Sequence, residues 1–277
     1  MLITTVRPTA LGVALRAWSS LLRAARLMLP LFLITYVLMA GLGIAIDRLS
    51  AILSIPSIDA LKEIVTAGRR LPWLGVSEAI GKDVVICIVQ AVIAAPLAVA
   101  MHRFILLGEP HRFYFISRLT IRLARWIFAL QVPVLILVWL ILFARGATAL
   151  VPLLFVLLFA LLGFLMQTLQ LFPAMAVEEP SAGISSRLET ALERAEGMFW
   201  LALVALVLTF LPIGVVQAVA MRVSVKLVAH APLIVPLAKA ALGIVTVALA
   251  AAAVSWLYSY GAHKPKTAIQ SQQLSQA

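Results

Sequence analysis

The sequence predicts an all-α protein, a polytopic transmembrane helical bundle with six spans and amphipathic interfacial helices. The first observation is composition, because 64% of the 277 residues are hydrophobic and 12% are charged, whereas soluble domains have about 25% charged residues. The second is a mean hydropathy of +1.10. The third is that several uncharged runs approach or exceed the roughly 18 to 20 apolar residues that cross a bilayer core. These observations exclude a soluble fold.

The chain begins with an expected amphipathic cytoplasmic arm over residues 1–26. Its apolar residues recur at helical spacing, at Leu11, Leu15, Trp18, Leu22 and Ala25. Arg16, Arg23 and Arg26 fall on another face, so the arm is expected to lie on the membrane surface. A curvature-sensing or partner-docking role is the alternative to simple anchoring, which we favour. The arginines and the lack of a cleavage pattern indicate a retained first span rather than a signal peptide.

A transmembrane domain is expected over residues 27–260. Its six spans are predicted at 27–46, 84–101, 126–143, 147–171, 198–221 and 240–260. The only cysteine, Cys87, lies within the second span and can form no intrachain disulfide. Proline occurs once in each of the first five spans, at Pro30, Pro96, Pro133, Pro152 and Pro212. Broken helices build some transporter sites, but proline is common in membrane helices generally.

The connections differ in polarity. Residues 47–83 and 222–239 are more apolar than ordinary loops and contain prolines, so we expect short interfacial or re-entrant segments there. Residues 261–277 form a polar tail with few large apolar side chains, which predicts disorder. Whether the two apolar connections enter the membrane is left open.

Basic residues predict the orientation of the spans. With the N-terminus inside, the cytoplasmic connections carry 13 Lys and Arg and the opposite connections carry nine. Positive charge is concentrated on the cytoplasmic side of membrane proteins, so both termini are expected in the cytoplasm. The net charge of +11 and the pI of about 10.7 then indicate anionic lipid headgroups as partners and no nucleic acid.

The predicted spans contain glutamine but no Asp, Glu, Lys, Arg or His. Ionisable groups at depth mark proton-coupled transporters and intramembrane hydrolases, so both classes are disfavoured. The intramembrane amides are Gln90, Gln131, Gln167, Gln170 and Gln217. They have two interpretations: hydrogen bonds between helices, or a polar path for a solute. Clustering of Gln90, Gln131, Gln167 and Gln217 around one cavity would favour transport.

The connection from 102 to 125 is rich in arginine. We expect its arginines to contact anionic lipid headgroups from the cytoplasmic side, through Arg103, Arg112, Arg118, Arg122 and Arg125. His102, Glu109 and His111 invite a metal interpretation, but their spacing matches no standard zinc pattern. We therefore treat both histidines as ordinary interfacial residues and predict no metal and no cofactor.

The longest polar stretch between apolar regions runs from 171 to 200. Residues 183–197 are predicted to form a short amphipathic helix that ends at Gly197, with Phe199 and Trp200 in the aromatic belt of the next span. Glu178 and Glu179 directly follow the fourth span. The carboxylates of this stretch either solvate an interfacial helix, which we favour, or include a lock between Glu178 and the basic connection at 102–125.

The order of residues in this stretch resembles that of a known group of proteins. The matching residues are Pro173, Ala176, Val177, Glu178, Gly197, Met198, Phe199 and Trp200. They resemble six-helix bacterial inner-membrane proteins, a group that includes the membrane domain in front of some glycerophosphodiester phosphodiesterases and stand-alone proteins of unknown function. The resemblance implies six spans in a bacterial inner membrane. A catalytic barrel needs about 250 residues, so the enzymatic activity of the fused proteins does not carry over.

Together these features predict a non-enzymatic inner-membrane protein, either an accessory subunit with an unidentified membrane partner or a membrane-organising factor. The alternative is a small-solute or lipid transporter that uses the intramembrane glutamines and the proline-containing helices.

Overall fold

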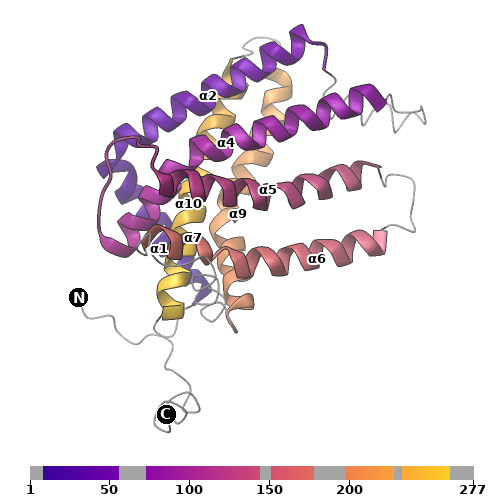
Figure 1. Cartoon of the computed structure of the whole chain (residues 1–277). Coiled ribbons are helices and arrows are strands. Elements are labelled where there is room, and N and C mark those ends of the chain that lie inside the picture. The colour runs from indigo at the N-terminus through magenta and orange to yellow at the C-terminus, as the bar shows by residue number, and fades with distance from the viewer. Residues whose placement is uncertain (1–8, 56–72, 144–150, 178–196, 228–232, 263–277) are drawn as a thin grey trace, which may run out of the picture.

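The computed structural model describes residues 9–55, 73–143, 151–177, 197–227 and 233–262 (Figure 1). These ranges contain helices and no strand. The helices are α1 (Ala10–Leu27), α2 (Leu29–Ile52), α4 (Trp73–Leu107), α5 (Arg118–Phe143), α6 (Val151–Thr168), α7 (Leu171–Val177), α9 (Phe199–Leu227) and α10 (Ile234–Ala262). The predicted all-α class is therefore confirmed.

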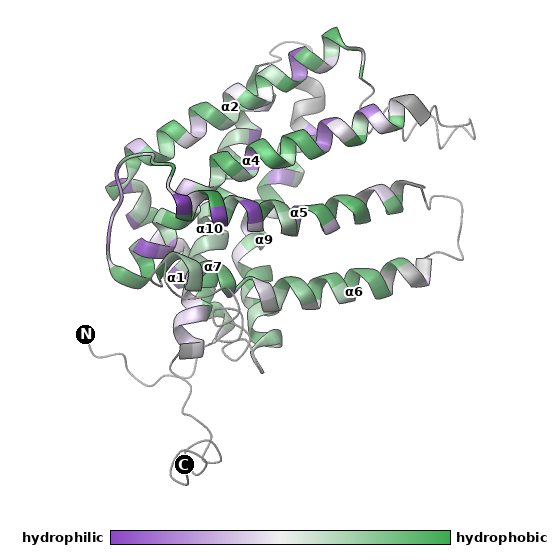
Figure 2. Cartoon of the chain, viewed as in Figure 1, coloured by the Kyte–Doolittle hydropathy of each residue, from purple (hydrophilic) through white to green (hydrophobic). Residues whose placement is uncertain are grey.

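Six segments are long and apolar enough to cross a membrane. They are Leu29–Ile52, Gly75–Leu107, Arg118–Ile141, Val156–Val177, Phe199–Ala220 and Ile234–Gly261. Each overlaps one of the six predicted spans, and Figure 2 shows hydrophobic residues along most of their length. The chain is a multi-pass membrane protein with the predicted number of membrane-crossing helices.

Helices α2, α4, α5, α9 and α10 are longer than the corresponding predicted spans. Candidate spans include Asp47 near the end of α2 and Lys82, Asp83 and His102 in α4. The predicted spans themselves contain no ionisable residue, but the helices continue past these uncharged runs and carry the ionisable residues beyond them. A helix continues past such residues as long as its backbone hydrogen bonds are made. Parts of the connections at 47–83 and 222–239 are thus helical.

The boundary between α1 and α2 follows from local chemistry. Thr9 precedes α1, and its Oγ1 accepts a hydrogen bond from the backbone N–H of Gly12 at 3.1 Å, as an N-cap residue does. Met28 ends α1 with φ −117° and ψ 29°. Pro30 lies in the first turn of α2, where the missing N–H costs nothing. The arm and the first span are therefore separate helices joined at Met28.

The fourth predicted span, 147–171, is interrupted. Helix α6 ends at Thr168 and α7 begins at Leu171, with a turn between them. Pro173 lies in the first turn of α7, a position that tolerates proline. This turn brings the buried side chains of Leu171 and Met175 into the main hydrophobic core.

Helices α4 and α10 form the centre of the bundle. About half of the apolar window of each is buried, 50% for α4 and 56% for α10, against 17% for α2. Their contact surfaces are rich in alanine, with Ala95, Ala248 and Ala252 fully buried. Small residues allow membrane helices to approach closely, because lipid supplies no hydrophobic force between them. In Figure 1, α4, α5 and α6 run side by side, and α10 packs against α4.

Helix α1 packs on the protein through a face that the sequence did not indicate. Val13, Ala17 and Ala24 are fully buried against the rest of the bundle. Trp18 Nε1 donates to the Thr209 carbonyl at 3.2 Å, and Trp256 Nε1 lies 3.2 Å from Ser20 Oγ. The predicted apolar face, with Leu11, Leu15 and Leu22, is instead exposed. This exposed face remains available to lipid.

The two ends of the bundle are packed differently. At the end that holds α1, Val13 clusters with Met198, which directly precedes α9, with Ala202 of α9 and with Leu257 of α10. At the opposite end Ile52 is 77% exposed and Val219 is 57% exposed. Figure 1 shows the ends of α2, α4, α5 and α6 spread apart on the side away from α1.

Candidate functional site

A cavity of about 800 Å³ lies along α10, between α2, α4, α5 and α9. Its wall is mainly apolar, with Met39 and Leu42 from α2, Ile86 from α4, and Ile127 from α5 among its side chains. Most small-molecule sites have volumes of about 300–1,000 Å³, apolar walls and a few placed polar groups. The cavity has the size and the lining of a ligand site.

Three of the predicted glutamines line this cavity from three different helices. Gln90 lies on α4, Gln131 on α5 and Gln217 on α9. Gln170 is buried, with 3% of its surface exposed, but it is not part of the cavity wall. Gln167 lies in α6, and its side chain falls outside the described atoms. Three of the five amides thus line one cavity, and Gln170 does not.

One of these amides has an unused hydrogen-bonding atom. The Oε1 atom of Gln131 is buried and has no hydrogen-bond partner within the described ranges. A buried polar atom without a partner costs about 1–3 kcal/mol. Because this amide lines the cavity, a ligand with a hydrogen-bond donor can recover that cost.

The cavity is open at one end and closed at the other. Asp47, Gln217 and Lys239 line the open end and are exposed. His102 and Val254 line the closed end, where they are 2% and 3% exposed. The wall follows α10 from Ile234 to Val254, a distance of about 30 Å at 1.5 Å per residue. The open end lies on the side away from α1.

His102 is the residue whose environment differs most from the prediction. It was predicted to be an ordinary interfacial residue, because the second span was expected to end at Met101. Helix α4 instead continues to Leu107 and carries His102 into the core. There its Nδ1 atom lies 2.7 Å from Ser255 Oγ of α10. The interfacial prediction was wrong, and a buried imidazole forms part of the cavity wall.

The residues of the metal hypothesis do not converge. His102 is buried beside Ser255, Glu109 pairs with Arg103, and His111 is exposed. Across the described ranges, no group of three or more His, Cys, Asp or Glu side chains lies close enough to hold a metal ion. The expectation that the protein binds no metal therefore stays a prediction.

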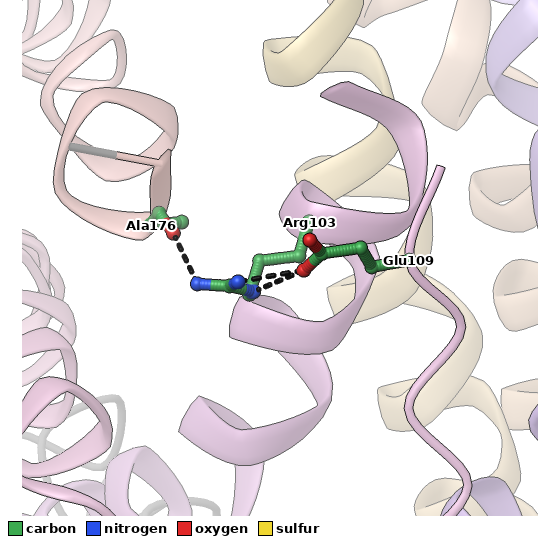
Figure 3. A network of polar contacts seen from close by, with 3 residues as sticks. All are labelled: Arg103, Glu109 and Ala176. Atoms are coloured by element: carbon green, nitrogen blue, oxygen red, sulfur yellow. Dashed lines mark hydrogen bonds and ion pairs between the residues drawn. The ribbon is translucent and has the colours of Figure 1, made fainter. Parts of the chain in front are cut away.

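Arg103 connects the end of α4 to α7 (Figure 3). Its guanidinium donates to Glu109 Oε2 at 2.6 and 3.1 Å and to the Ala176 carbonyl at 3.4 Å. The Glu178 hypothesis predicted a contact between the segment after the fourth span and the basic connection at 102–125. Arg103 makes such a contact through the Ala176 carbonyl, and its carboxylate partner is Glu109. Glu178 itself lies outside the described residues.

The segment between α4 and α5 carries exposed aromatic and basic side chains. Phe113 is 80% exposed and Phe115 is 72% exposed, next to the exposed Arg112. Burial raises the pKa of the neighbouring Tyr114, whose hydroxyl donates to the Ile93 carbonyl at 3.3 Å. Aromatic and basic residues of this kind are typical of a membrane interface.

The remaining predicted headgroup contacts lie on α5. Arg118 and Arg125 are exposed and Arg122 is half-buried. Arg125 borders a smaller groove of about 240 Å³ that also includes Val92 and Phe128. Contact with anionic headgroups stays a prediction for these arginines and for Arg112.

The motif residues lie at the start of α9 and in α7. Gly197 has a φ of +68°, which favours glycine, and Met198 is buried behind it. The rings of Phe199 and Trp200 make an edge-to-face contact with centroids 5.2 Å apart, and Trp200 is 72% exposed. Pro173 is buried in α7. The predicted helix at 183–197 falls, apart from Gly197, outside the described part of the chain.

The chain matches no protein-family model, no curated protein and no solved structure. The relation to the phosphodiesterase membrane domain therefore stays a prediction, and the function is argued from the cavity.

Sequence reasoning missed three polar residues of the cavity: Asp47, His102 and Lys239. All three lie just outside the uncharged runs that defined the spans. An i, i+4 series on α4 that includes Gln90, Ala94, Ala98 and His102 is the signal that could have found the histidine, because residues four apart share a helix face.

Proposed function

We propose that this protein binds a chain-like amphiphile of the lipid class within the membrane and passes it across or along the bilayer. The observation that carries the proposal is the convergence of Gln90, Gln131 and Gln217 on one cavity. Amides that served only to join helices would be expected at separate contacts. Their position around a common space favours the lipid-transporter hypothesis over an accessory role.

The shape of the cavity supports a chain-like ligand. A volume of about 800 Å³ over about 30 Å gives a mean cross-section of about 27 Å². Such a channel is about 6 Å wide, enough for one extended alkyl chain with carbon–carbon contacts of about 3.5–4.0 Å. Asp47 and Lys239 line the exposed end, where the ligand would enter.

The proposal assigns no covalent chemistry to the cavity and places the protein in a bacterial inner membrane with both termini in the cytoplasm. Under that orientation the cavity opens toward the non-cytoplasmic leaflet, because its open end lies on the side away from α1. An amphiphile from that leaflet is the natural occupant.

Gly243 provides a direct test. It lines the cavity, and a Cβ placed on it would meet no atom within 4 Å. Gly243→Phe should therefore fill the cavity without a clash in the helix. Gly214→Phe is the matched control, because Gly214 lies on α9 with the same free space and is not part of the cavity wall.

The measurement is native mass spectrometry of the full chain after gentle extraction, followed by lipid analysis of the retained molecules. We expect the wild type and Gly214→Phe to retain one lipid class at fixed stoichiometry, and Gly243→Phe to lose it. Retention of the same lipids by Gly243→Phe would contradict the cavity as the site. A co-purifying protein with no retained lipid would instead support the accessory hypothesis.

A further inference from the structure

The tautomer of His102 follows from its neighbours. Ser255 Oγ lies 2.8 Å from the Ala251 carbonyl and 2.7 Å from His102 Nδ1. A carbonyl oxygen only accepts, so the single hydroxyl proton of Ser255 is donated to Ala251. Ser255 Oγ must then accept from His102, which places the imidazole proton on Nδ1. The Nε2 atom of a neutral imidazole in this state carries a lone pair and accepts a hydrogen bond.

The surroundings leave that lone pair available to a ligand. His102 lines the closed end of the cavity, and its only hydrogen bond within the described ranges is the one to Ser255. The next residue, Arg103, is engaged by Glu109 and the Ala176 carbonyl. Gln131 Oε1 is a second buried acceptor without a partner in this part of the chain. Among the described residues, the closed end of the cavity therefore presents the Nε2 acceptor with no free cation beside it.

We propose that His102 is a specificity-determining residue that accepts a hydrogen bond, through Nε2, from the hydroxyl group of an uncharged long-chain alcohol or acylglycerol. This inference rests on the proposed function, since it names the ligand class of the same cavity. A hydroxyl donates to the lone pair of Nε2. A carboxylate is rejected, because two acceptors would face each other and an unpaired charge would be buried. A plain hydrocarbon leaves Nε2 without a partner.

The experiment measures binding of tritiated hexadecan-1-ol to the purified full chain in detergent at pH 8. Unlabelled hexadecan-1-ol, palmitate and hexadecane are the competitors, and the pH keeps palmitate ionised. For the wild type we expect the alcohol to compete about three- to tenfold better than hexadecane, the range that one net hydrogen bond supplies. We expect palmitate to be the weakest competitor of the three.

Two substitutions of His102 separate hydrogen bonding from packing. His102→Leu removes the acceptor while Ser255 keeps its bond to the Ala251 carbonyl, so the preference for the alcohol over hexadecane should disappear. His102→Gln places an amide oxygen near the position of Nε2 and should retain the preference. Gln170→Leu is the control, because Gln170 is buried but does not line the cavity. Its preference should equal that of the wild type.

Ser255→Ala gives a second measurement if His102→Leu does not fold. Without the serine, the ring is free to carry its proton on Nε2 and to donate it to a carboxylate, so palmitate should compete better than it does for the wild type. An undiminished preference for the alcohol in folded His102→Leu, or an unchanged rank of palmitate in Ser255→Ala, would overturn the inference and leave lipid binding intact. A wild type that binds none of the three probes would overturn the proposed function itself.

Discussion

At the scale of single residues, some polar side chains bond within their own helix and others join two helices. Hydroxyl groups such as Thr35 and Thr246 bond to the carbonyl four residues earlier in their own helix, at 2.8 and 2.7 Å, which satisfies them without a partner helix. Aromatic and basic side chains instead join α1 to α10. The guanidinium of Arg16 lies 5.1 Å from the Trp256 ring centroid and donates to the Tyr260 hydroxyl.

Replacement of Arg16 by alanine should weaken the attachment of α1. A cation–π contact is worth about 0.5–1 kcal/mol at an exposed site, and the hydrogen bond adds to it, so we expect a loss of about 1–2 kcal/mol. The measurement is the melting temperature in detergent. Arg23→Ala is the control, because Arg23 is an exposed arginine on the same helix. Equal melting of the two variants would contradict a role for the Arg16 contacts.

At the scale of elements, α1 has three faces rather than the two that its sequence shows. Ala17 and Ala24 are buried against the bundle, Leu15 and Leu22 are exposed, and the exposed Arg23 lies on a third face. Such a helix can contact protein and lipid at the same time. The arginine and the exposed leucines fit a position at the membrane interface.

A larger residue on the buried face should displace α1. Ala17 is completely buried, so Ala17→Leu forces extra methyl groups into a filled contact, which typically costs about 1–3 kcal/mol. Ala25→Leu is the matched control on the same helix, because Ala25 is only partly buried. We expect limited proteolysis to cleave within α1 faster in Ala17→Leu than in Ala25→Leu. Identical cleavage rates would show that α1 does not depend on this face.

At the scale of the whole molecule, the helix ends are divided between a packed side and an open side. The packed side holds α1, the last turns of α10 and the connection between α4 and α5, as the contacts of Arg16, His102 and Arg103 show. The open side holds the ends of α2 and the starts of α4 and α10. The chain crosses the membrane an odd number of times between any helix end on the packed side and any helix end on the open side. The two sides are therefore expected to face different compartments.

Thiol labelling measures this arrangement directly. The native Cys87 is first replaced by serine, and a single cysteine is then introduced at exposed His111 or at exposed Ser54. With the N-terminus in the cytoplasm, a membrane-impermeant maleimide added to intact cells should label Ser54→Cys. His111→Cys should react only after the cells are lysed. The reverse pattern would invert the orientation predicted from basic residues.

The number of spans and the presence of intramembrane glutamine were predictable from sequence, because transfer into a bilayer depends on the composition of a local run. Helix bounds were less predictable. Lys82, Asp83 and His102 extend α4 beyond its uncharged run, since charged residues near the ends of long membrane helices need only a polar partner or a route to the interface. His102 is buried beside Ser255, which is 153 residues away in sequence.

The sequence by itself determined that this is an all-α membrane protein with six crossing segments and a basic, amphipathic N-terminal helix. Only the tertiary structure decided that Gln90, Gln131 and Gln217 share a cavity, that Gln170 does not, and that α1 packs through its alanines. The reason is that lipid is as apolar as the helix surfaces. Hydropathy therefore determines which segments cross the membrane, but it does not determine which faces of the helices contact one another. That choice depends on close packing and on individual hydrogen bonds between helices.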